Sequence, residues 1–95
     1  MVVGICRFVL SIPGSQTLKD KRSRIRPILH ALHHDHHVSV AEVDLQNVAD
    51  QAVLAFALVS NDRRVVNSEI DRILARIETI GDVVLGESDF EIQNY

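Results

Sequence analysis

The segment from Thr17 to His37 constrains the fold most strongly, because it combines a regular apolar period with dense positive charge. Its apolar side chains recur every three or four residues, which is the spacing of one face of an α-helix. That face comprises Leu18, Ile25, Ile28, Leu29 and Leu32. A second row follows the flank of the same helix and comprises Lys19, Arg22, Arg26, His30, His33 and His37. The segment therefore predicts one amphipathic helix with a core face and a cationic edge.

The size and composition of the chain indicate a single folded domain over residues 1–95. A chain of 95 residues has room for one hydrophobic core and no room for a second domain. Apolar residues make up 46% of the chain, which excludes the disordered class, because disordered chains have too few apolar residues to form a core.

The sequence lacks the features that direct a protein into a membrane or out of the cell. Its apolar runs, such as residues 52–59, are too short to cross a bilayer, and the N-terminus lacks the pattern of a secretory signal. Cys6 is the only cysteine and lies in an apolar run typical of a strand, which favours a buried thiol in a reducing compartment. We therefore expect a cytoplasmic protein without membrane association.

Charge is divided unevenly along the chain. Residues 1–40 hold six Lys and Arg side chains against two carboxylates, a net charge of +4. Residues 41–95 hold four arginines against eleven carboxylates, a net charge of -7. This asymmetry favours an anionic partner for one face, or head-to-tail contact between copies.

Four segments have the β-branched and apolar composition of strands. They are residues 2–12, 38–43, 51–60 and 83–92, with a bulge expected in the last at Gly86 and Glu87. Ser15 or Thr17 is expected to cap the first helix, and Ser60-Asn61-Asp62 is expected to supply the cap of a second helix that ends near Gly81. The apolar stripe of the second helix comprises Val66, Ile70, Ile73, Leu74 and Ile77. Its expected solvated side comprises Glu69, Arg72, Arg76 and Glu78.

The order strand, helix, strand, strand, helix, strand is typical of the α+β class and of a ferredoxin-like βαββαβ sandwich. Right-handed crossovers place both helices on one face of a four-stranded antiparallel sheet, with the first and third strands central. The other face would then expose an apolar patch that soluble monomers seldom leave uncovered, so we expect a homodimer in which a second copy covers it. The expected interface residues are Val3, Ile5, Val9, Val53, Ala55, Ala57 and Val59.

The cationic edge of the first helix is the candidate binding site. Basic side chains near a helix start oppose the helix dipole by roughly a few tenths of a kcal/mol each, so helix stability does not explain them. Such a cluster can neutralise phosphates, and we expect it to bind RNA. The alternative is a solvated helix side whose long stems cover the edge of the core. The candidate residues are Lys19, Lys21, Arg22, Arg24, Arg26, His30 and His33.

Two other groups of residues carry weaker signals. His30 lies one helical turn from His33 and His34, a spacing that can hold a divalent metal, but no cysteine or carboxylate completes the set. Three carboxylates surround the connection between the second and third strands, and no nucleophile lies near them in sequence. These carboxylates are Glu42, Asp44 and Asp50. We expect no metal site, no cofactor and no catalysis.

Three blocks of the sequence resemble the YlxP-like family of small bacterial proteins of unknown function. They are Ser-Gln-Thr-Leu-Lys-Asp-Lys-Arg at 15–22, Val-Ser-Val-Ala-Glu-Val-Asp at 38–44, and Ala-Val-Leu-Ala-Phe-Ala-Leu-Val-Ser-Asn-Asp at 52–62. The resemblance implies a ferredoxin-like fold and, through the usual gene neighbourhood of that family, a connection with ribosome maturation. This chain departs from the family pattern late in the first helix, where it has histidines in place of arginines.

Together these features favour a small cytoplasmic, non-enzymatic protein that binds ribosomal RNA or a ribosome-assembly intermediate through its first helix. The alternative is a structural or regulatory homo-oligomer that binds protein or a small anion and has no nucleic-acid role.

Overall fold

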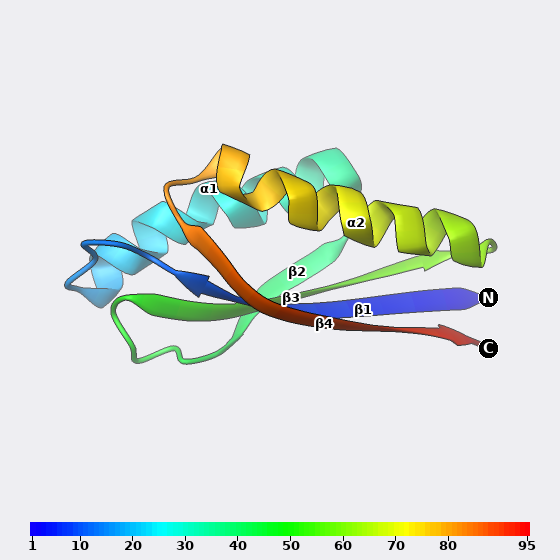
Figure 1. The fold of residues 1–95 in the computed structure, drawn as a ribbon, viewed down its shortest axis with the longest axis horizontal. Coiled ribbons are helices and arrows are strands. Elements are labelled where there is room, and N and C mark those ends of the chain that lie inside the picture. Colours follow the sequence, from blue (N-terminus) through cyan, green and yellow to red (C-terminus); the bar gives the residue numbers. More distant parts are fainter.

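The computed structural model describes the whole chain, residues 1–95, as six elements in the order β1, α1, β2, β3, α2, β4 (Figure 1). The strands are β1 (Val2–Ser11), β2 (Ser39–Asp44), β3 (Gln51–Ser60) and β4 (Val84–Asn94). The helices are α1 (Leu18–His36) and α2 (Arg63–Ile80). The predicted ferredoxin-like α+β fold is confirmed.

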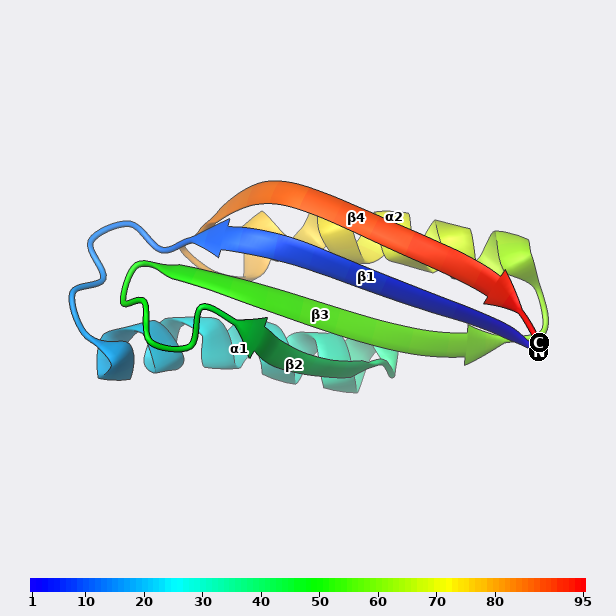
Figure 2. The ribbon, with the colours of Figure 1, turned by 90° about the horizontal axis from the view of Figure 1, so that it is seen from below.

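The four strands form one sheet in the order β2-β3-β1-β4, and every neighbouring pair is antiparallel. Both helices lie on the same side of this sheet (Figure 1). Figure 2 shows the other side, where the strands are seen directly with both helices behind them. The strand order confirms the predicted central position of the first and third strands. Neither helix is long and apolar enough to cross a membrane.

The hydrophobic core fills the layer between the sheet and the helices. Alternate residues of β1 and β3 point into it, and the rings of Phe8 and Phe56 lie 6.2 Å apart there. The buried helix residues are Ile25, Ile28 and Leu32 from α1 and Val66, Ile70, Ile73 and Ile77 from α2. Gly4 lies under α2, and a side chain at this position would collide with Val66. The apolar stripes of both helices thus cover the sheet as predicted.

Side chains and backbone geometry set the helix ends. The Thr17 hydroxyl accepts a hydrogen bond from the Asp20 amide at 3.0 Å, and the Asp62 carboxylate accepts one from the Arg64 amide at 2.8 Å. These caps satisfy amides that have no partner inside the helix. At the end of α1, His37 adopts a left-handed conformation with φ 55°, which turns the chain toward β2.

The strand bounds differ slightly from those predicted. β2 starts one residue later than expected, because Val38 packs into the core before the strand begins. β4 continues two residues further, to Asn94, where the amide of Tyr95 donates to the Met1 carbonyl at 2.7 Å. The expected bulge is present, since the pairing of β4 with β1 shifts register across residues 86–87.

Candidate nucleic-acid interface

Five basic side chains form a row along the outward side of α1, which we name the cationic strip. It comprises Lys19, Arg22, Arg26, His30 and His33, all of which are exposed. Successive members are three or four residues apart, so they lie one above another on the helix. With a rise of about 1.5 Å per residue, the strip is roughly 21 Å long.

The strip holds most of the cations that lack an acidic partner. Ion pairs engage six Lys and Arg side chains elsewhere, namely Arg7, Lys21, Arg24, Arg64, Arg72 and Arg76. The four without a carboxylate oxygen within 4.0 Å are Lys19, Arg22, Arg26 and Arg63. Three of these four belong to the strip, which therefore presents uncompensated positive charge to the solvent.

Lys21 does not belong to this surface, which corrects its assignment to the nucleic-acid site. Its side chain is 1% exposed and reaches down from α1 to the sheet. The ammonium group lies 2.8 Å from Oε2 of Glu42, a buried oxygen with no other polar partner. It also donates to the carbonyl oxygens of Leu45 at 2.9 Å, Gln51 at 3.2 Å and Gln46 at 3.3 Å. Lys21 thus joins α1 to β2 and to the connection between β2 and β3.

Arg24 is also largely occupied within the protein. Its guanidinium donates to the carbonyl oxygens of Pro13 at 2.5 Å and Asp82 at 2.6 Å, and lies 3.4 Å from the Asp82 carboxylate. These contacts join the connection after β1 to the connection before β4. Because its donors already have partners, Arg24 lies outside the cationic strip.

The histidines of α1 separate into an exposed group and one buried residue. The rings of His30 and His34 are 4.1 Å apart, and His33 lies edge-on to His34 at 5.3 Å. His36 instead lies between the helices, with Nδ1 2.5 Å from Oε1 of Glu69. Glu69 was expected on a solvated side, and this contact corrects that prediction. No three His, Cys, Asp or Glu side chains in the molecule come together in a way that could hold a metal ion.

The carboxylates near the second turn have structural partners. Glu42 pairs with Lys21, and Asp44 accepts a hydrogen bond from the Leu45 amide at 2.7 Å and lies 3.6 Å from the Arg7 guanidinium. Cys6 lies on the helix side of β1, where burial and, secondarily, the charge of Asp89 raise the pKa of its thiol to about 11. A thiol in this state stays protonated near neutral pH and is a poor nucleophile.

The side of the sheet away from the helices, which we name the open face, carries the residues predicted for a dimer interface. Val59 and Ile5 are 66% and 49% exposed, and Val3, Val9, Ala55 and Ala57 are partly buried. Val53 is only 3% exposed, which means that its own chain already covers it, so it contributes little to an interface. This corrects the inclusion of Val53.

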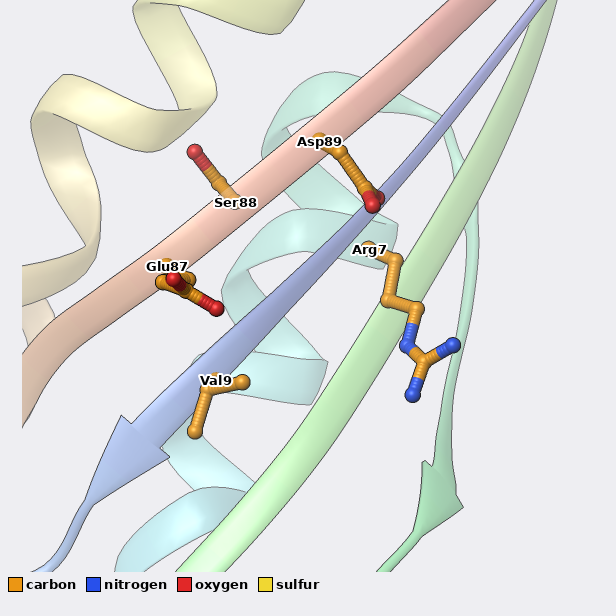
Figure 3. Close-up of a pocket in the computed structure, with 5 residues that line it drawn as sticks. All are labelled: Arg7, Val9, Glu87, Ser88 and Asp89. Atoms are coloured by element: carbon orange, nitrogen blue, oxygen red, sulfur yellow. The ribbon is translucent and has the colours of Figure 1, made fainter.

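Three acidic residues of β4 share the open face and were missed by sequence reasoning. Glu87, Asp89 and Glu91 alternate along the strand, and none has a Lys or Arg nitrogen within 4.0 Å. The register pairs Asp89 with Arg7 and Glu91 with Ile5, which places them on that face. Figure 3 shows Glu87 and Asp89 beside Arg7 and Val9. Their alternation in the sequence was the signal that could have revealed them.

Residues 3–90 match the family described as "Protein of unknown function (DUF503)". The chain belongs to this family. It is 28% identical over 78 residues to "Uncharacterized protein YlxP" of Bacillus subtilis (strain 168), covering 82% of this chain and 83% of that protein. The resemblance to YlxP-like proteins is therefore confirmed.

A designed protein of solved structure shares the fold at low sequence identity. The de novo designed protein Foldit4 superposes with a TM-score of 0.53 at 14% identity, over 100% of this chain and 99% of that one. Rv0793 from Mycobacterium tuberculosis gives a TM-score of 0.46 at 15% identity, over 99% and 93% of the two chains.

The Lys21–Glu42 pair gives a structural role to two of the blocks on which the family resemblance rests. Lys21 lies in the Leu-Lys-x-Lys-Arg block, and Glu42 lies in the Ser-Val-Ala-Glu-Val block. In the folded DUF503 domain these blocks meet in one buried ion pair, although they are about twenty residues apart in the chain. This pair positions α1 over β2, and the cationic strip on the outward side of α1 depends on that position.

Proposed function

We propose that this protein is a non-enzymatic, cytoplasmic RNA-binding protein whose partner is ribosomal RNA or a ribosome-assembly intermediate. The observation that carries the proposal is the cationic strip, where Lys19, Arg22 and Arg26 have no acidic partner. Free basic side chains in a row can each neutralise a phosphate and release its counterions, which is the main source of affinity for nucleic-acid backbones.

The position of these cations supports a role outside folding. Lys19 lies in the first turn of α1, where the helix dipole disfavours positive charge by roughly a few tenths of a kcal/mol, and Arg22 follows directly after that turn. Neither side chain makes an ion pair that would offset this cost. An anionic ligand placed over the strip would stabilise both.

The mode of binding follows from the side chains that are available. Base recognition by a ferredoxin-like sheet uses aromatic side chains on the open face as stacking platforms. Phe8 and Phe56 point into the core, and the register with Cys6 places Phe90 on the helix side of β4. No phenylalanine therefore lies on the open face, and Tyr95, whose hydroxyl donates to Gln93 at 2.9 Å, lies only at its end, after β4. A single ring at the end of the sheet is no platform for successive bases, so we expect backbone contacts through the strip with little sequence preference.

The test is the salt dependence of binding to a ribosomal RNA fragment, measured by fluorescence anisotropy between 50 and 200 mM salt. In the test variant, Lys19, Arg22 and Arg26 are all replaced by Gln. The control variant replaces Arg63, Arg64 and Arg72 by Gln, which removes the same charge from the surface of α2. The slope of log K against log salt is negative, because salt weakens phosphate contacts. If each strip residue contacts one phosphate, the test variant should reduce the magnitude of this slope by about 2 to 3, and the control should change it much less.

Two outcomes would contradict the proposal. Negligible binding of the unmodified protein at 50 mM salt would exclude an RNA role of this kind. Equal loss in the two variants would show that binding responds to net charge alone, and the strip would then have no special part in it.

A further inference from the structure

The strand register defines how the open face is arranged. Residues paired across the sheet form rows, each written here in the order of the strands β2, β3, β1 and β4 as far as each strand extends. From one end of the face to the other, the rows are Val59/Val3/Gln93, Ser39/Ala57/Ile5/Glu91, Ala41/Ala55/Arg7/Asp89, Asp44/Val53/Val9 and Gln51/Ser11/Val84. The apolar residues are concentrated on the two central strands, and the acidic residues lie toward the edges.

We propose that a second copy of this chain covers the open face, with the two-fold axis parallel to the strands and between β1 and β3. This surface is on the opposite side of the sheet from α1, so the inference goes beyond the proposed RNA function and does not depend on it. Under this symmetry β1 of one copy lies over β3 of the other, and β4 lies over β2. The rows remain aligned near the centre of the interface.

Side-chain size is complementary under this symmetry. The middle rows carry the large side chains Ile5 and Arg7 on β1, and the small side chains Ala57 and Ala55 directly beside them on β3. When β1 of one copy lies over β3 of the other, Ile5 faces Ala57 of the partner, whereas the Arg7 side chain extends across β3 of its own chain. Side chains of packed sheets interdigitate in this way, with about 10 Å between the sheets. Ile5, which is half exposed in one molecule, would be enclosed.

Charge is complementary as well. The Arg7 side chain extends away from β4 and across β3, where it lies 3.6 Å from Asp44 of β2 (Figure 3). The axis places this guanidinium over β4 of the second copy, which carries the unpaired carboxylates of Glu87 and Asp89. Each Arg7 would then lie between Asp44 of its own chain and the carboxylates of Glu87 and Asp89 of its partner. This arrangement accounts for the unpaired acids at the edge of an apolar face.

The area of the face is close to what a stable dimer requires. The strands β1, β2, β3 and β4 have 10, 6, 10 and 11 residues. At about 4.8 Å between strands and about 3.3 Å per residue, they project an area on the order of 600 Å². A standard interface buries about 800 Å² of accessible surface per partner, and accessible surface exceeds projected area because side chains protrude. One copy is therefore sufficient to cover the face.

The first measurement is the mass in solution by light scattering at high micromolar concentration. We expect twice the 10.6 kDa chain mass. Val59→Glu should weaken the dimer about tenfold or more, because it places a charge against the apolar face of the partner. Val65→Glu is the matched control, since Val65 is also an exposed valine, 54% against 66%, but lies on α2. A monomeric native protein, or equal effects of the two substitutions, would overturn the proposal.

A second pair of variants covers the case in which Val59→Glu fails to fold. Ala57→Glu lies within the face, and Ala75→Glu makes the same change at an exposed position of α2. Circular dichroism identifies the folded variants, and the proposal requires that Ala57→Glu alone dissociates the dimer. A dimer that survives both Val59→Glu and Ala57→Glu would show that its interface lies elsewhere.

The position of the axis is tested by cross-linking with a bis-maleimide about 10 Å long. Ser39 and Glu91 belong to one row on opposite edges of the sheet, so the axis places Ser39 of one copy over Glu91 of the other. A mixture of the Ser39→Cys and Glu91→Cys proteins should cross-link, whereas neither protein alone should. Cross-linking of the Glu91→Cys protein with itself would place β4 over β4 and overturn the proposed axis.

Discussion

The two faces of β1 have the same alternating pattern in sequence but different surroundings in the molecule. Phe8 and Leu10 point toward the helices and are fully buried, whereas Ile5 and Arg7 point the other way and are exposed. Both faces are rich in apolar residues, yet the two helices cover only one of them. Folding of a single chain therefore accounts for the apolar residues of the helix side alone, and those of the open face require another explanation.

The largest expected effect comes from shortening one side chain on each face of β1. Phe8→Ala should lower the free energy of unfolding by about 3–5 kcal/mol, because it leaves a cavity beside Phe56 in the core. In the monomer, Ile5→Ala should cost less than about 1 kcal/mol, because Ile5 is half exposed there. Urea denaturation at low micromolar concentration measures both values. If Ile5→Ala costs as much as Phe8→Ala even in the monomer, the open face is part of the core.

The second test concerns the two nearby lysines of α1, one on each side of the helix. Lys21→Met should cost about 3 kcal/mol of unfolding free energy, because it leaves the Glu42 carboxylate without its partner. Lys19→Met removes the same charge from the exposed side and should change stability by less than about 0.5 kcal/mol. Adding Glu42→Leu to Lys21→Met should recover part of the loss. Equal effects of the two single substitutions would contradict the buried role of Lys21.

The smallest of the three effects is a pH dependence that arises on the helix side of β1. The pKa of Cys6 is raised from 9.0 to about 11 in the folded protein, so the unfolded chain loses this proton at lower pH. The contribution of the Cys6 thiol to the free energy of unfolding is fully present below about pH 9 and falls by about 2–3 kcal/mol as the pH approaches 11. Denaturation curves at pH 8 and pH 10.5 measure this loss. Cys6→Ala lacks the thiol and should show a smaller decline, whereas an equal decline would refute the assignment.

Much of the fold could be predicted from local patterns. The apolar periods of residues 17–37 and 62–81 and the alternation in residues 51–60 led to the observed elements within one or two residues. Thr17 is one of the two caps predicted for α1, and Asp62 lies in the segment 60–62 predicted to cap α2. The bulge near Gly86 was also predicted. Each of these features depends on a short-range property of a few residue types. The order of the elements then left few topologies to consider, since right-handed crossovers place both helices on one face.

The site was predicted less completely, because charged residues in the same block have different surroundings. Lys21 and Arg22 are neighbours in a basic cluster, but one is buried against Glu42 and the other is exposed. Likewise, His36 belongs to a histidine run but lies between the helices, in contact with Glu69. Composition indicates that a segment is basic, but the number of its charges that remain free depends on partners that are distant in the chain.

The elements, their amphipathic faces and the uneven charge distribution can be predicted from the sequence alone, since they depend on residues within a few positions of one another. Which charges are neutralised depends on the folded structure, because ion pairs such as Lys21 with Glu42 join segments that are distant in the chain. The register of the sheet also aligned Arg7, Asp89, Ala55 and Ala57 on one open face. The pairing of strands sets such an alignment, and no single segment of the chain contains it.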